Sequence, residues 1–100
     1  MAHGPNADEV TSVMKLLVIT HNVGDPTPFI PDETRRTHEL QASGVVEQIY
    51  LKADWSGAVF IVESESAEEA RRQLSTLPLV SNGMTQLEVI ELVPPPVVPY

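Results

Sequence analysis

The chain has 100 residues, which is enough for one domain and too few for two. Apolar residues make up 42%, which predicts a packed core, and fourteen acidic against six basic residues give a net charge of −8. Such a chain, whose basic residues form no run, is a poor partner for nucleic acid or an anionic membrane surface. The absence of cysteine excludes disulfides, thiolate nucleophiles and cysteine-based metal sites.

The two ends of the chain predict little regular structure. Residues 1–13 mix glycine, proline and acids without a hydrophobic period, which predicts a flexible leader. This segment lacks the apolar stretch of a secretion signal, and no apolar run elsewhere approaches the ~20 residues that span a bilayer. We therefore expect a cytoplasmic protein with no membrane partner. Residues 94–100 contain four prolines, which predicts a stiff extended tail.

The first predicted elements are a strand, a loop and a helix. Residues 15–21 are apolar and β-branched, which is typical of a buried strand. Three prolines in residues 22–31 predict a loop. A helix is expected over residues 32–43, with Asp32 as its N-cap and Gly44 just beyond its end. The apolar face of this helix is thin, which favours the lining of a cleft over a dry core.

A hairpin is predicted next. Residues 45–52 alternate as a strand, which places one set of side chains on a common face: Val46, Gln48, Tyr50 and Lys52. A glycine-containing turn over residues 54–57 then leads into a partner strand over residues 58–63.

The last predicted elements are a second helix and a final strand. The helix is expected over residues 67–77, with Ser66 as N-cap, Glu69 at the capping-box position and Pro78 ending it. Residues 86–92 alternate as the last strand. The whole order is β-α-β-β-α-β, so we predict an α+β fold of the ferredoxin-like type.

Two stretches of this order are recognisable: the helix from residue 32 to Gly44, and the second helix, with Ser66-Ala67-Glu68 at its start and Leu74-Ser75-Thr76-Leu77-Pro78-Leu79 at its end. Over residues 14–93 the chain resembles the muconolactone isomerase family. The resemblance implies a dimeric α+β barrel, in which two ferredoxin-like sheets face one another. It also implies a homodimer or a higher homo-oligomer.

Muconolactone isomerase moves a carbon–carbon double bond in an unsaturated five-membered lactone. This chemistry needs a base, a group that stabilises the dienolate oxygen, and reprotonation at another carbon. The resemblance therefore implies cofactor-independent proton transfer on a small unsaturated lactone or related ring compound, in the catabolism of aromatic compounds. No metal or organic cofactor is expected, since three scattered histidines without cysteine are an unlikely metal site.

Four side chains are the candidates for catalysis: His21, His38, Tyr50 and Lys52. A histidine titrates near neutral pH and can act as a base. The phenol can donate to a developing oxyanion, and the lysine can stabilise it by charge. Each side chain also has a non-catalytic interpretation: a histidine can be solvated, the tyrosine can line the barrel, and the lysine can pair with an acid. We expect the site between the first helix and the sheet.

Four more residues are candidates for binding substrate: Leu17, Ile19, Glu33 and Trp55. Leu17 and Ile19 stand where the resemblance implies polar, proton-transferring side chains on the first strand. Glu33 matches an acid of the family, although its ordinary role is electrostatics at the helix start. Trp55 can cover a flat ligand or pack at a dimer edge.

Two other functions stay open. The first is a cofactor-free oxygenase or cyclase of natural-product tailoring, by analogy of fold alone. The second is a non-catalytic module for ligand binding or assembly, which the apolar Leu17 and Ile19 favour. Hydrolases and nucleotide enzymes are excluded, because the sequence has no phosphate loop, nucleophile elbow or dinucleotide fingerprint.

Overall fold

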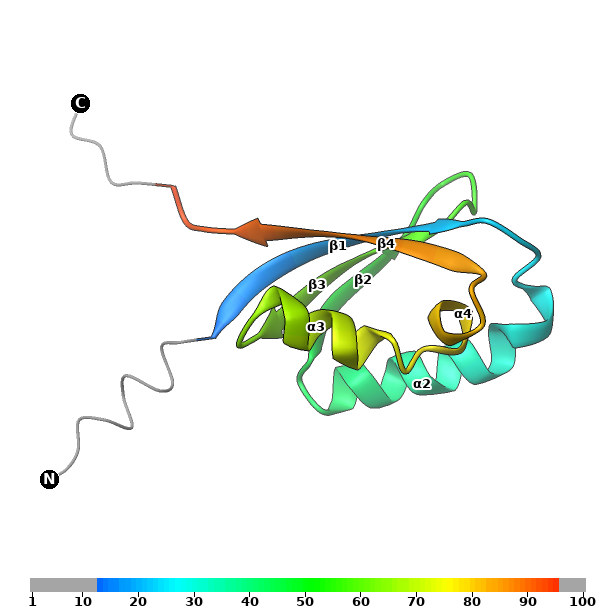
Figure 1. Cartoon of the computed structure of the whole chain (residues 1–100), viewed down its shortest axis with the longest axis horizontal. Coiled ribbons are helices and arrows are strands. Elements are labelled where there is room, and N and C mark those ends of the chain that lie inside the picture. Colours follow the sequence, from blue (N-terminus) through cyan, green and yellow to red (C-terminus); the bar gives the residue numbers. More distant parts are fainter. Residues whose placement is uncertain (1–12, 96–100) are drawn as a thin grey trace, which may run out of the picture.

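The computed structural model describes residues 13–95 as a four-stranded antiparallel sheet with helices on one of its faces (Figure 1). The predicted leader and most of the proline-rich tail lie outside the described residues. In the part that is described, no helix is long and apolar enough to cross a membrane. The elements follow in the order β1 (Met14–Asn22), η1 (Thr27–Phe29), α2 (Ile30–Ala42), β2 (Val46–Leu51), β3 (Ala58–Ser64), α3 (Ala67–Leu74), α4 (Pro78–Ser81) and β4 (Thr85–Leu92).

The strands lie in the order β2-β3-β1-β4, and each neighbouring pair is antiparallel. The strands at the two ends of the chain are therefore neighbours, and the connections through α2 and through α3 with α4 lie on the same side of the sheet (Figure 1). The α+β class predicted from the sequence is confirmed, and the strand order is compatible with a ferredoxin-like domain.

The core lies between the helices and the sheet. Alternate residues of β1, Leu16 and Val18, are fully buried on this face. Each such side chain contributes about 1.5–3 kcal/mol to folding when it leaves water. The same core contains Leu40 from α2, Val46 from β2, Phe60 and Val62 from β3, Ala70 and Leu74 from α3, and Leu77.

The other face of the sheet, which we call the open face, is apolar at its centre. Leu17 and Ile19 alternate with the core residues of β1 and therefore lie on the face away from the helices. The register places Leu17 between Ile61 of β3 and Ile90 of β4, and Ile19 beside Val59. No helix of the described chain covers these side chains.

The start of α2 differs from the prediction. The helix begins at Ile30, so Asp32 lies within its first turn and is not the N-cap. Pro31 is compatible with this position because the first N–H groups of a helix have no partner within it. The 3-10 turn η1 directly precedes the helix, so the predicted loop ends earlier than residue 31. The predicted end is confirmed, because Gly44 adopts a left-handed φ of 88° after the last turn.

A β-bulge changes the faces predicted for β2. The register shifts between Val46 and Gln48, which lie opposite the consecutive residues Val62 and Ile61 of β3. The prediction that Val46 shares a face with Gln48 and Tyr50 is therefore wrong. Val46 points into the core, while the other two side chains lie on the open face.

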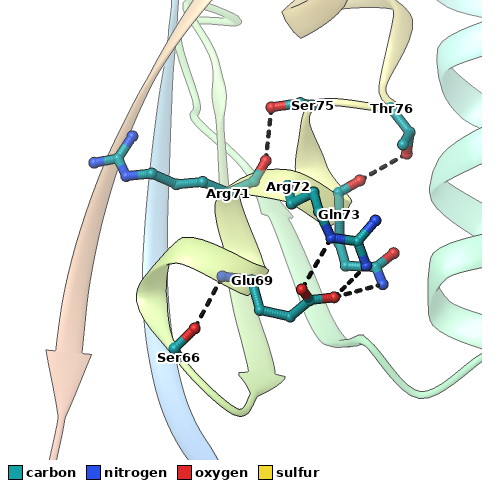
Figure 2. Close-up of polar contacts among 7 residues, drawn as sticks. All are labelled: Ser66, Glu69, Arg71, Arg72, Gln73, Ser75 and Thr76. Carbon is teal, nitrogen blue, oxygen red and sulfur yellow. Dashed lines mark hydrogen bonds and ion pairs between the residues drawn. The ribbon is translucent and has the colours of Figure 1, made fainter.

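Ser66 caps the N-terminus of α3, as the sequence predicts, but Glu69 does not form the capping box (Figure 2). Ser66 Oγ accepts a hydrogen bond of 3.0 Å from the backbone N–H of Glu69. The carboxylate of Glu69 does not complete a capping box, because it pairs with Arg72 and accepts from the side chain of Gln73.

The C-terminus of α3 lies at Leu74, earlier than the predicted residue 77. Two hydroxyls satisfy carbonyls of the last turn: Ser75 Oγ donates to the carbonyl of Arg71 at 2.7 Å, and Thr76 Oγ1 to that of Gln73 at 2.6 Å (Figure 2). The chain then forms α4, which begins at Pro78. A proline at the first position of a helix has a suitable φ and lacks only an N–H that would be unpaired.

Candidate functional site

A cavity of about 480 Å³ lies between α2, α4 and the covered face of the sheet. Its walls are mostly apolar, and they include Ile30 of α2, Ile49 and Phe60 of the sheet, and Leu79 and Val80 of α4. A volume of this size is within the range of about 300–1,000 Å³ that is typical of small-molecule sites. The candidate site is therefore this cavity.

The polar side of the cavity comes from one stripe of α2. Ile30, Glu33, Thr34, Thr37 and His38 follow the spacing i, i+3, i+4, i+7 and i+8, so they share a helix face, and all five line the cavity. In a helix that packs on a core, this stripe is apolar. Here most of its positions are polar, and a cavity stands where side chains would otherwise pack.

Glu33 is the acid that lines the cavity. Its carboxylate is half-buried and accepts a hydrogen bond of 2.9 Å from the backbone N–H of Leu79, in the first turn of α4. It thus stabilises the start of a helix 46 residues away in sequence. Burial raises the pKa of Glu33, and the hydrogen bond from Leu79 opposes this effect only in part. A carboxyl in this environment is suited to proton exchange with a bound molecule.

Two threonines with different surroundings form part of the cavity floor. Thr20 Oγ1 accepts a hydrogen bond of 2.8 Å from the N–H of Ala58. Thr85 is only 9% exposed, and its hydroxyl has no hydrogen-bond partner among the described residues. A buried polar group without a partner destabilises a protein by about 1–3 kcal/mol, so it calls for an explanation.

The loop between β2 and β3 closes one end of the cavity. Gly57 lies so close to β1 that an added Cβ would stand 2.0 Å from the carbonyl oxygen of Thr20. Trp55 lines the cavity, is 75% exposed and has a left-handed φ of 63°. This backbone conformation is unusual for a large side chain and is found preferentially at functional sites.

The residues predicted from the sequence divide between the two faces of the sheet. Glu33, His38 and Trp55 line the cavity. Tyr50 and Lys52 lie on or beside the open face, as does His21, together with the predicted binding residues Leu17 and Ile19. The structure therefore does not bring the four candidate catalytic residues into one site of a single chain.

Two of the catalytic candidates on the open face, His21 and Lys52, contact one another. Lys52 Nζ lies 2.7 Å from His21 Nδ1, which is within hydrogen-bond distance. The hydroxyl of Tyr50 donates to Gln48 Oε1 at 3.3 Å. Among the described residues Lys52 forms no salt bridge with an acid, and its hydrogen-bond partner is His21. Hydrogen bonds from a neighbouring serine lower the pKa of Asp54, and the charge of Lys52 nevertheless contributes to this effect.

Sequence reasoning missed four hydroxyl-bearing residues of the cavity: Thr20, Thr34, Thr37 and Thr85. The helical spacing of the two threonines with Glu33 and His38 was a usable signal, because together they form a polar stripe. No such signal existed for the two strand threonines, since an isolated threonine is common in strands.

The fold and the cavity define a small α+β domain with an apolar pocket and one half-buried carboxyl. No family model matches the chain, and no curated protein matches its sequence. The similarity to the muconolactone isomerase family therefore stays a prediction from the residues. Within residues 13–95, no three histidine, aspartate or glutamate side chains are grouped so that they can hold a metal ion.

Proposed function

We propose that this protein is a cofactor-independent, muconolactone isomerase-like enzyme that shifts a double bond in a small unsaturated lactone or related ring compound. The observation that carries this proposal is Glu33, a half-buried carboxyl of raised pKa in a largely apolar cavity. Groups with such perturbed pKa values concentrate at catalytic sites. The proposal also includes a cytoplasmic location and a role in the breakdown of aromatic compounds.

Proton transfer in the cavity follows a balanced sequence. The ionised Glu33 removes a proton from the carbon next to the conjugated system, and the electron pair of that C–H bond moves to the carbonyl oxygen as a dienolate. The same carboxyl, now protonated, exchanges its proton with solvent and delivers a proton to another carbon. Thr34 and Thr37 hydroxyls are available to donate to the dienolate oxygen, and His38 is a second group for moving protons. No oxidant or reductant is consumed.

Solvent exchange tests this mechanism. In D₂O, the wild-type protein should introduce deuterium into neutral butenolides that it isomerises. Glu33→Gln keeps an acceptor for the Leu79 N–H and removes the base, so turnover should fall by roughly 10²–10⁴-fold. The control is Glu39→Gln, an exposed position of the same helix that pairs with Arg36, and it should leave turnover unchanged. Equal activity in wild type and Glu33→Gln, with unchanged circular dichroism, would contradict the assignment.

We also propose that a second copy of the chain covers the open face and forms a dimeric α+β barrel. The support is the uncovered apolar cluster of Leu17, Ile19, Ile61 and Ile90 at the centre of the sheet. Polar pairs border it, such as Lys15 with Glu47 at 3.1 Å. An apolar centre with a polar rim is typical of a protein interface.

The second candidate function is ligand binding without turnover. The mostly apolar walls of the cavity favour it, because they can hold a ring compound without any chemistry. Saturable binding of ring compounds with no deuterium exchange would support this alternative. Oxygen consumption in the same assay would support a cofactor-free oxygenase.

A further inference from the structure

The cavity contains no fixed positive charge. All six lysine and arginine residues of the chain lie within the described part, and none of them lines the cavity. Five contact other side chains: Lys15 pairs with Glu47, Arg35 with Asp32, Arg36 with Glu39, Arg72 with Glu69, and Lys52 meets His21. Arg71 is exposed on α3 (Figure 2). An anionic ligand would therefore lose its hydration without gaining a salt bridge from these side chains.

Glu33, the only acid among the described residues of the cavity wall, also disfavours an anionic ligand. Glu33 is half-buried, and its hydrogen-bonded partner is a neutral backbone N–H rather than a cation. A ligand carboxylate beside it would place two like charges in an apolar space, which is unfavourable. A ligand cation, by contrast, would be attracted to the ionised form of this acid, so the charge argument applies to anions only.

The remaining polar groups of the cavity suit a neutral oxygen. The hydroxyls of Thr34 and Thr37 lie on the α2 stripe, and that of Thr85 is buried in the floor without a partner. A hydroxyl both donates and accepts, so it can pair with an alcohol or a carbonyl. Trp55 and Phe60 supply aromatic surface for a ring.

We propose that the cavity selects an uncharged ring compound with one hydrogen-bonding oxygen, which pairs with a threonine hydroxyl of the α2 stripe, and discriminates against the carboxylate of the same ring. This inference rests on the proposed function only because both use the same cavity. It names the substrate class as a neutral lactone, enone or phenol rather than a ring acid.

Three naphthalene probes of one shape test the proposal by calorimetric titration of the full chain at pH 8: 1-naphthalenemethanol, 1-naphthoate and 1-naphthalenemethylamine. The carboxylate should bind roughly 30-fold more weakly than the alcohol, as expected for repulsion across about 8 Å at an effective dielectric constant of 20. The amine is the control of opposite charge and should not show this loss. Glu33→Gln should strengthen binding of the carboxylate several-fold and leave the alcohol within about twofold.

A second variant tests the role of the hydroxyl. Thr37→Val should weaken binding of the alcohol several-fold and leave that of 1-methylnaphthalene, which has no oxygen, unchanged. A carboxylate that binds as tightly as the alcohol would overturn the proposal, as would the absence of binding by all three probes. Charge selection without lactone isomerisation would contradict the isomerase alone, and isomerisation without charge selection would contradict this inference alone.

Discussion

Both faces of the sheet carry apolar side chains, but the helices cover only one of these faces. Leu16 and Leu17 are consecutive residues of β1, yet Leu16 is fully buried beneath the helices and Leu17 lies on the open face. Because strand side chains alternate, one apolar strand supplies both faces. The helices cover Leu16 and Val18 of β1, whereas Leu17 and Ile19 lie on the open face, where we propose that a second copy of the chain binds.

The covered face itself has two parts. On α3, Ala70 and Leu74 are completely buried. On α2, the only buried residue is Leu40, and the polar stripe lines the cavity. We therefore expect α3 chiefly to stabilise the domain, while α2 lines the cavity in which we propose that a ligand binds.

The sharpest contrast between the faces should appear in a pair of leucine variants. Leu16→Ala should lower the free energy of unfolding by about 3–4 kcal/mol, because it opens a cavity in the core. Leu17→Ala should lower it by less than about 1 kcal/mol in dilute protein, and should weaken dimerisation. Urea denaturation measures the first effect and sedimentation velocity the second. Equal losses in urea, with unchanged sedimentation, would remove the distinction between the faces.

A pair of threonine variants sharpens the description of the cavity floor. Thr20→Val removes the acceptor of the Ala58 N–H, so the free energy of unfolding should fall by about 1–3 kcal/mol. Thr85→Val replaces a hydroxyl that has no partner, so it should leave stability unchanged or raise it by up to about 1 kcal/mol. Both side chains are buried and the substitutions are nearly isosteric. Thermal unfolding gives the comparison, and equal destabilisation would show that Thr85 has a partner after all.

The smallest expected effect is the pH dependence of Glu33. Burial raises its pKa above the ordinary value of 4.5, so the folded protein holds this proton more tightly than the unfolded chain. The resulting stabilisation is complete below the unfolded pKa and is lost as the pH rises through the folded one. Relative to wild type, Glu33→Gln should therefore become more stable as the pH increases from 4 upward.

Glu69 is the matched control for this titration. Its hydrogen bond from Arg72 lowers the pKa of Glu69, so its stabilisation is present above the unfolded pKa and is lost on acidification. Glu69→Gln should lose stability relative to wild type as the pH rises, with the opposite slope to Glu33→Gln. The same slope for both variants in urea titrations at several pH values would contradict the burial of Glu33.

The fold was predictable from the sequence because its signals are local. Alternation gives the strands, and Gly44 and Ser66 mark helix ends that the structure confirms. Two of the predictions from the sequence were wrong. A bulge turns Val46 into the core. Pro78 begins a helix where it was expected only to end one.

The site was less predictable because it depends on the faces of the sheet. Alternation groups His21 with Leu17, and it does not say which face the helices cover. The contact of Glu33 with the N–H of Leu79 joins residues far apart in sequence, and the unpartnered hydroxyl of Thr85 exists only in the folded chain.

A methyl correlation spectrum of the isoleucine, leucine and valine side chains tests the central claim most directly, since these methyls report the two faces separately. Addition of 1-naphthalenemethanol should shift the methyls of Ile30, Ile49 and Leu79, and dilution of the protein should shift those of Leu17 and Ile61. Ligand-induced shifts on the open face, with the cavity methyls unmoved, would contradict the account.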